Sequence, residues 1–168
     1  FNYPKYGAGF FYEKLSEKIK KNNTTIKLNH NLIKIVHDGN MIQKIKILDN
    51  QNNTLEEVAD DFIFSNPFTQ IVNLLEPPPP EDVLIAAKSL KYRHHIGVKL
   101  EIIGTLFEDN WIYVHDPRVK MARVSNYKNF SKHMSDHALK NPVTVEYFCF
   151  ENDEIWKKND SEIIDFAK

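Results

Sequence analysis

The sequence predicts an α+β protein built on a mixed or antiparallel β-sheet that carries helices. Two observations lead to this prediction. In the second half, short runs of β-branched and aromatic residues are separated by turn residues, as in an antiparallel sheet. In the first half, helical periodicity precedes alternating runs around an Asp-Gly turn. The runs of the second half cover residues 92–103, 111–116, 122–127 and 143–150, with turns expected at 108–110, 116–117 and 141–142.

Composition and charge exclude several classes of function. The 168 residues include 22 basic and 23 acidic side chains, so no electrostatic argument favours nucleic acid as a partner. No run approaches the roughly 20 apolar residues of a membrane span, so no transmembrane segment is expected. A single cysteine, Cys149, excludes an internal disulfide and a cysteine-based zinc site. Because no signal peptide opens the chain, a cytoplasmic location is expected.

The chain begins with a predicted helix and a β-meander. Residues 10–22 are expected to be helical, because Phe11, Leu15 and Ile19 recur every four residues on one face. Asp38-Gly39-Asn40 between two alternating apolar runs is a hairpin signal. The expected strands around it are residues 25–29, 32–37 and 41–48, with 55–59 pairing back.

A short apolar strand is expected to follow the meander. Residues 61–65 are almost wholly apolar, which is typical of a strand buried on both faces. They lead into Asn66-Pro67 and a predicted helix over residues 68–75. Small polar residues at the C-terminal end of a buried strand are where open α/β sheets place ligands, so a ligand contact is expected at this turn.

Four consecutive prolines at 77–80 mark the expected domain boundary, because such a run forms a stiff polyproline II spacer. The predicted division is therefore residues 1–76, the 77–80 linker and residues 81–168. A helix over residues 81–90 should lead into the sheet, and Asn159 should cap a C-terminal helix. Because the chain starts without Met and stops within that helix, we expect an internal fragment of a larger protein.

The order of these parts resembles the middle of flavin-containing amine oxidases. The resemblance rests on the Gly-rich loop and helix, on residues 26–29 and 32–35 with their meander, and on residues 59–67. The protoporphyrinogen oxidase-like and phytoene desaturase-like enzymes share this order, and UDP-galactopyranose mutases are more distant relatives. Three stretches of the second half look like bacterial FAD-dependent oxidoreductases of this superfamily, namely residues 90–93, 109–117 and 146–151.

This resemblance implies FAD as the cofactor of the full-length parent. It makes residues 1–76 part of an FAD-binding module and residues 81–168 the core of a substrate-binding domain. It also implies a main-chain contact from Leu32 to the adenine end of FAD, with a purely structural core role as the alternative. The turn Ser65-Asn66-Pro67 would lie close to the dinucleotide. The Gly-x-Gly-x-x-Gly fingerprint does not occur in the sequence, so the fragment alone should be inactive and should bind FAD weakly or not at all.

Lys99 is the candidate catalytic residue. Alternation along residues 92–103 puts Lys99 on the same strand face as Arg93 and His95. In several amine oxidases a lysine on the matching strand reaches the flavin through water, and the resemblance implies that role here. The alternative is a solvated sheet face without a chemical role.

A second polar stripe is expected across the two strands that follow. Trp111, Tyr113 and His115 share one face, where Arg123, Ser125 and Tyr127 could meet them. Aromatic side chains with one or two cations suit an anionic or sugar-like ligand, although cross-strand packing is the alternative and is favoured for Trp111. The residues expected to contact a small-molecule substrate are Tyr3, Arg93, His95, Tyr113, His115, Arg123 and Tyr127.

The sequence contains no motif for metal binding or for hydrolase chemistry. The seven histidines do not cluster at metal-ligand spacing, so no metal site is expected, and no Gly-x-Ser-x-Gly elbow is present. The expected parent is an FAD-dependent oxidoreductase that oxidises a C–N or C–C bond by hydride transfer to flavin, with the remaining parts of its chain as partners of this fragment. The alternatives are a non-catalytic module that binds a nucleotide sugar or polysaccharide, and a part of a UDP-galactopyranose mutase-like enzyme.

Overall fold

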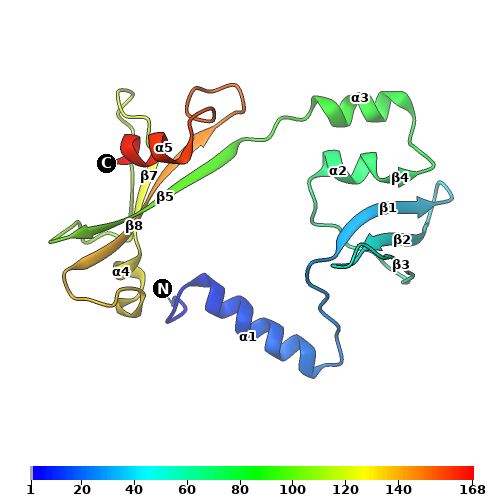
Figure 1. Cartoon of the computed structure of the whole chain (residues 1–168), viewed down its shortest axis with the longest axis horizontal. Coiled ribbons are helices and arrows are strands. Elements are labelled where there is room, and N and C mark those ends of the chain that lie inside the picture. The colour runs from blue at the N-terminus through cyan, green and yellow to red at the C-terminus, as the bar shows by residue number, and fades with distance from the viewer. Residues whose placement is uncertain (1) are drawn as a thin grey trace. The chain divides into compact units, whose positions relative to one another are not determined.

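The chain divides into two compact units with α+β architecture, which confirms the predicted fold class (Figure 1). The computed structural model describes residues 2–168. One unit contains the residues up to Thr24 together with Tyr92–Lys168, and the other is Thr25–Lys91. The four prolines at 77–80 lie inside the second unit. No helix among the described residues is long and apolar enough to cross a membrane.

The Thr25–Lys91 unit contains a four-stranded sheet in the order β3-β2-β1-β4. The first three strands form the predicted antiparallel meander, and β4 runs parallel to β1. At the hairpin, Asp38 Oδ1 accepts hydrogen bonds from the backbone N–H groups of Asn40 and Met41, and Gly39 has φ 104°. The strands are β1 (Asn31–His37), β2 (Ile42–Leu48), β3 (Thr54–Glu57) and β4 (Leu75–Glu76).

Two short helices complete this unit. They are α2 (Phe68–Asn73) and α3 (Glu81–Ser89), and both confirm helices predicted from the sequence. Ile35 of β1 and Val72 of α2 are buried, with 0% and 3% of their surface exposed. The core of this unit is therefore small.

Two predicted strands are not formed, and both predictions were wrong. Residues 25–29 and 61–65 are irregular, and Ile63 is 98% exposed. Phe62 and Phe64 still show the alternation of an extended chain, because their rings stack on each other at 6.2 Å. An extended apolar run becomes a strand only when a neighbouring backbone accepts its hydrogen bonds, and residues 2–168 supply no such neighbour to these two runs.

The other unit contains the predicted antiparallel sheet, and its strand order is β5-β8-β7-β6. Its strands are β5 (His94–Ile103), β6 (Trp111–Tyr113), β7 (Arg123–Asn126) and β8 (Lys140–Cys149). Its helices are α1 (Ala8–Lys21), α4 (Tyr127–Phe130), the short 3-10 helix η1 (Lys132–Met134) and α5 (Asp160–Ala167).

The turn predicted at Asn141-Pro142 was wrong, because both residues belong to β8. Pro142 pairs with Glu101 of β5, whereas the pairing of β8 with β7 reaches only to Val143. Proline has no N–H group, so a strand tolerates it where a second neighbouring strand is missing. Pro142 suggested a turn, but the strand accommodates it just outside the stretch of β8 that pairs with a strand on both sides.

One face of this sheet packs against α5. Val98, Val145 and Tyr147 form a core cluster with Ala167 of α5, and the helix lies beside β5 and β8 in Figure 1. Asn159 caps α5 as predicted: its side chain accepts from the N–H of Glu162, and Glu162 Oε2 accepts from the N–H of Asn159. Because this face is covered, the opposite face is left for polar side chains.

Replacing Ile35 by alanine should destabilise the Thr25–Lys91 unit. Ile35 is fully buried, so Ile35→Ala should lower the free energy of unfolding by about 2–5 kcal/mol. The matched control is Ile63→Ala, which should change it by less than about 0.5 kcal/mol because Ile63 is exposed. Denaturant unfolding measures both, and equal effects of the two substitutions would contradict the burial described here.

Candidate functional site

Four strands of the β5-β8-β7-β6 sheet contribute side chains to its face opposite α5, here called the polar face. The strand register aligns them in rows, because directly paired residues project to the same side of a sheet. One row is Gly97, Glu146, Arg123 and Tyr113, and the next is Lys99, Thr144, Ser125 and Trp111. His95 and Phe148 are paired at the other end of the face.

Glu146 is the centre of the polar face. Its side chain is only 4% exposed. Its Oε2 accepts hydrogen bonds from Nε and Nη2 of Arg123 at 3.0 and 2.5 Å, and lies 3.0 Å from Nε2 of His95. Its Oε1 accepts from Ser125 Oγ at 2.9 Å. A buried carboxylate requires such partners, and the two neighbouring strands β5 and β7 supply them.

These partners keep the buried carboxylate charged. Burial alone would raise the pKa of Glu146, but hydrogen bonds from Arg123, Ser125 and His95 outweigh burial and the net effect is a lowered pKa. The hydrogen bond to Glu146 in turn raises the pKa of Arg123. At neutral pH the two side chains therefore form an ion pair within the sheet face.

Gly97 lies beside the contact between His95 and Glu146. Gly97 is paired directly with Glu146, whereas His95 reaches Glu146 diagonally from the position opposite Phe148. A Cβ atom at position 97 would lie 3.1 Å from Cγ2 of Thr144, which is closer than ordinary packing, and 3.4 Å from Cε1 of His95, which is an ordinary contact. The missing side chain therefore avoids crowding with Thr144.

Aromatic residues border the polar face. The Arg123 guanidinium lies 5.7 Å from the ring centre of Tyr113. Trp111 stacks on Phe130 at 5.8 Å, and the Tyr3 ring lies 4.9 Å from that of Phe130. Tyr127 lies 6.0 Å from Phe130, and its hydroxyl oxygen accepts a hydrogen bond from Thr144. Packing therefore accounts for Trp111, and Tyr3 joins this border through Phe130.

The other residues predicted for this half of the chain also lie on or beside the polar face. Lys99 is exposed and paired with Thr144. The Arg93 guanidinium lies 5.3 Å from the ring centre of Phe148, and the exposed His115 ring lies 6.4 Å from Tyr113. The structure thus brings together the residues predicted for catalysis and substrate binding.

The predicted cofactor contacts belong to the Thr25–Lys91 unit. Leu32 is half-buried in β1 and paired with Ile47 of β2. The parallel strand β4 pairs only with Ile35 and Val36, so within the described chain the start of β1 has a strand neighbour on one side. Ser65-Asn66-Pro67 is exposed and precedes α2. A free strand edge suits a main-chain contact at Leu32, whereas the strand expected to present Ser65 is not formed.

Glu146 was not predicted from the sequence. It lies within the apolar run of residues 143–150, where composition indicates a buried strand. The signal that could have identified Glu146 was its charge, because an acidic residue inside a buried strand almost always has a partner. Its alternation with Val145 and Tyr147 places it on the same face as Thr144.

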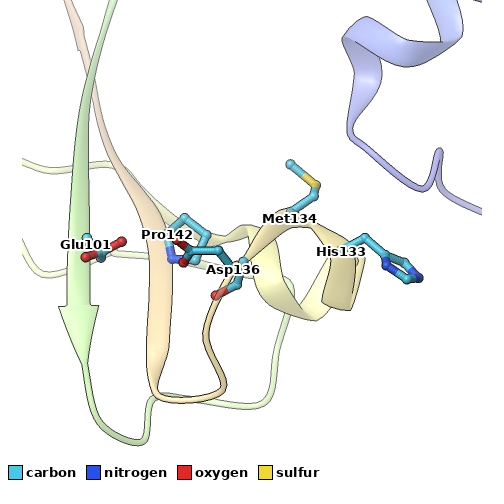
Figure 2. A pocket seen from close by; sticks show the side chains of 6 residues that line it. Glu101, His133, Met134, Asp136 and Pro142 are labelled. Atoms are coloured by element: carbon cyan, nitrogen blue, oxygen red, sulfur yellow. The ribbon is translucent and has the colours of Figure 1, made fainter.

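A cavity of about 350 Å³ lies at the end of the polar face near Glu101 and Pro142 (Figure 2). His133, Met134, Ser135 and Asp136 also line it, and the His133 ring points away from Glu101 in this view. Lys140 Nζ lies 3.0 Å from Glu101 Oε1. Among residues 2–168, no group of three or more histidine, cysteine, aspartate or glutamate side chains could hold a metal ion.

Comparison with known proteins shows a likeness of fold. No family model and no curated protein matches the sequence. A reduced UDP-galactopyranose mutase superimposes with a TM-score of 0.75 at 18% identity over 98% of this chain. A protein from Pyrococcus furiosus gives 0.68 at 14% identity over 93%, and a protein assigned as a protoporphyrinogen oxidase from Exiguobacterium sp. 255-15 gives 0.62 at 16% over 92%. The chain corresponds to 35%, 36% and 33% of these three structures.

Removing the charge of Glu146 should destabilise the chain in a pH-dependent way. Glu146→Gln leaves Arg123 without its partner and should cost about 3 kcal/mol at neutral pH, the lower end for a buried pair because Arg123 is 32% exposed. The lowered pKa means that the stabilising effect of the carboxylate is complete above its ordinary pKa of 4.5 and is lost as the pH falls through the folded value. The difference in unfolding free energy between wild type and Glu146→Gln should therefore shrink below pH 4.5.

The control for this experiment is Glu101→Gln. Glu101 pairs with Lys140 but is 52% exposed, so its loss should cost less than about 1 kcal/mol. A cost for Glu146→Gln as small as that of the control, or one that does not change with pH, would contradict the central role of Glu146.

Proposed function

We propose that this chain is part of an FAD-dependent oxidoreductase of the flavin-containing amine oxidase superfamily. The β5-β8-β7-β6 sheet would belong to its substrate-binding domain, and the polar face would contact a small-molecule substrate. The observation that carries the proposal is the polar face itself, where predicted site residues from β5, β6 and β7 surround the ion pair between Arg123 and the buried Glu146 of β8. The likeness of fold to proteins named as a mutase and as an oxidase supports it.

The charge of the polar face indicates an anionic or sugar-like substrate. Glu146 cancels the charge of Arg123, so the cations that remain for a ligand are Lys99 and Arg93. Tyr113 is 54% exposed, and its ring offers an apolar surface beside the guanidinium of Arg123. A few positive groups among aromatic rings bind anions and sugar rings in proteins.

FAD would be held by residues of the Thr25–Lys91 unit together with further parts of the parent protein. Leu32 would offer backbone groups from the free part of β1, and the exposed turn Ser65-Asn66-Pro67 would lie near the dinucleotide. When bound, the flavin supplies hydride acceptance. Lys99 would hold a water molecule beside the flavin, on the side where the substrate binds. Because the sequence contains no phosphate-binding fingerprint, the isolated chain should retain little or no FAD.

A mutase-like parent is the second candidate, because the fold of the chain also resembles that of a UDP-galactopyranose mutase. Such an enzyme uses reduced flavin without net oxidation of its substrate. Net consumption of an electron acceptor during turnover would separate an oxidoreductase from a mutase.

The first test is the visible absorption of the longest natural protein that contains this sequence. A bound flavin should give bands near about 370 and 450 nm, whereas the isolated chain should be colourless. A protein that stays colourless after incubation with FAD would contradict the proposal. Saturable binding of a nucleotide sugar by that colourless protein would indicate a non-catalytic binding module.

Replacing Lys99 tests its proposed role in the flavin-containing protein. Lys99→Met should lower the turnover number by about tenfold or more, because a positioned polar group at the reaction site is lost. The flavin absorption should not change, since Lys99 is not among the proposed FAD contacts. Lys157→Met removes an exposed lysine elsewhere in the same unit and should have no effect. Equal turnover of the two variants would rule out a role for Lys99 in the reaction.

A further inference from the structure

His95 lies at one end of the polar face and has one ring nitrogen in a contact and one without. Its Nε2 atom is 3.0 Å from Oε2 of Glu146, and its side chain is 49% exposed. Its other ring nitrogen, Nδ1, forms no hydrogen bond with any of residues 2–168. The two nitrogens therefore differ in their surroundings, and Nδ1 is the one left for a ligand.

Glu146 determines which nitrogen of the neutral imidazole carries the hydrogen. Burial would raise the pKa of Glu146, but the hydrogen bonds of its partners lower it overall, so the side chain is a carboxylate at neutral pH. A carboxylate only accepts hydrogen bonds, and Nε2 of His95 must therefore donate in this contact. The remaining nitrogen of a neutral ring is then an acceptor. Glu146 thus keeps Nδ1 as a hydrogen-bond acceptor.

This acceptor differs from the charged groups around it. The carboxylate of Glu146 is buried, and Glu101, which β5 places on the same face, is paired with Lys140. The charged side chains of the face that have no ion pair among the described residues are Arg93 and Lys99. Both are donors only. A ligand that donates a hydrogen bond can therefore use the imidazole, whereas its anionic group is attracted by the unpaired cations.

Arg93 and His95 both contact Phe148. The Arg93 guanidinium lies 5.3 Å from the ring centre of Phe148, and the ring centres of His95 and Phe148 are also 5.3 Å apart. Phe148 is 37% exposed, so it offers an apolar surface next to both groups. One cation, one acceptor and one aromatic ring are therefore grouped at this end of the polar face.

This group suits a ligand whose anionic group stands beside a hydroxyl group. A guanidinium binds a carboxylate through two parallel hydrogen bonds, and a hydroxyl group can donate to Nδ1. An uncharged donor fits better than an ammonium group, because Arg93 and Lys99 leave the face positively charged. A 2-hydroxy carboxylate carries both required groups on neighbouring carbon atoms.

We propose that Arg93 and His95 bind a 2-hydroxy carboxylate. The guanidinium holds the carboxylate, Nδ1 of His95 accepts the hydrogen bond of the hydroxyl group, and Glu146 is the residue that positions the imidazole. This inference rests on the proposed function, because it places the substrate on the polar face. It narrows the class of substrate from anions in general to hydroxylated carboxylates.

The test compares mandelate with phenylacetate, which has the same ring and carboxylate but no hydroxyl group. In titrations of the folded chain followed by calorimetry, mandelate should bind about fivefold more tightly, as expected for one additional hydrogen bond. His95→Phe should remove this difference by weakening the binding of mandelate alone. The matched control is His94→Phe on the opposite face of β5, which keeps an aromatic ring beside Trp156 and should preserve the difference.

A second variant keeps the test decisive if His95→Phe disturbs folding. Arg93 precedes β5 and is exposed, so Arg93→Gln leaves the strand itself unchanged. It should raise the dissociation constants of both acids by the same factor, about threefold or more, and reduce their dependence on salt. Lys157→Gln, which removes an exposed lysine elsewhere in the unit, should change neither constant.

The role of Glu146 can be measured on the ring nitrogens of His95. In nitrogen NMR spectra of the neutral ring, the wild type should carry its hydrogen on Nε2 alone. Glu146→Gln should increase the share of the form with hydrogen on Nδ1, because an amide can donate to Nε2. The same variant should lower the affinity for mandelate and leave that for phenylacetate unchanged.

Three results would overturn this inference: equal binding of the two acids, a preference for mandelate that survives His95→Phe, or a hydrogen on Nδ1 in the neutral wild type. None of these measurements requires flavin. A parent protein that stays colourless with FAD would contradict the proposed function without changing these results, so the two failures can be distinguished.

Discussion

The architecture of the unit that contains the β5-β8-β7-β6 sheet depends on the buried carboxylate of Glu146. A charged group without water needs hydrogen-bond donors, and here they come from β5 and from β7 on either side of β8. Because side chains alternate along a strand, a shift of one residue in either pairing would turn the donors to the opposite face. The ion pair therefore selects one register of three strands, and this register also sets the positions of Lys99 and Thr144.

Strand β8 serves two surfaces at once. Its odd-numbered residues from Val143 to Cys149 face the apolar side, and Thr144 and Glu146 face the polar side, yet all of these are buried. A central strand buried on both faces is unusual for a sheet whose two sides carry different chemistry. The polar side remains buried because Arg123, His95 and Tyr127 cover it from the neighbouring strands. The candidate site and the core cluster beside α5 thus share one structural element.

The β5-β8-β7-β6 sheet was predicted well from the sequence because the patterns that indicate its strands are local. Period-two alternation in residues 92–103 and the Asn159 cap need no knowledge of neighbours, and both were confirmed. The strand predicted at residues 61–65 was wrong because an apolar run does not reveal whether another backbone lies beside it. The role of Glu146 was not predicted because its hydrogen-bond donors are 21, 23 and 51 residues away in the sequence. The contact of Tyr3 with Phe130 is likewise beyond any local pattern.

Gly97 links the identities of two neighbouring positions. A Cβ atom at position 97 would crowd Cγ2 of Thr144, whereas its distance from the imidazole of His95 would be an ordinary contact. Related chains with serine in place of Thr144 lack that methyl group and should therefore accept alanine at position 97, whereas chains that keep the threonine should keep the glycine. Substitution at the two positions is expected to be correlated across homologues, and the order in which the two changes arise is constrained, because the threonine must be lost before the glycine can be replaced without crowding.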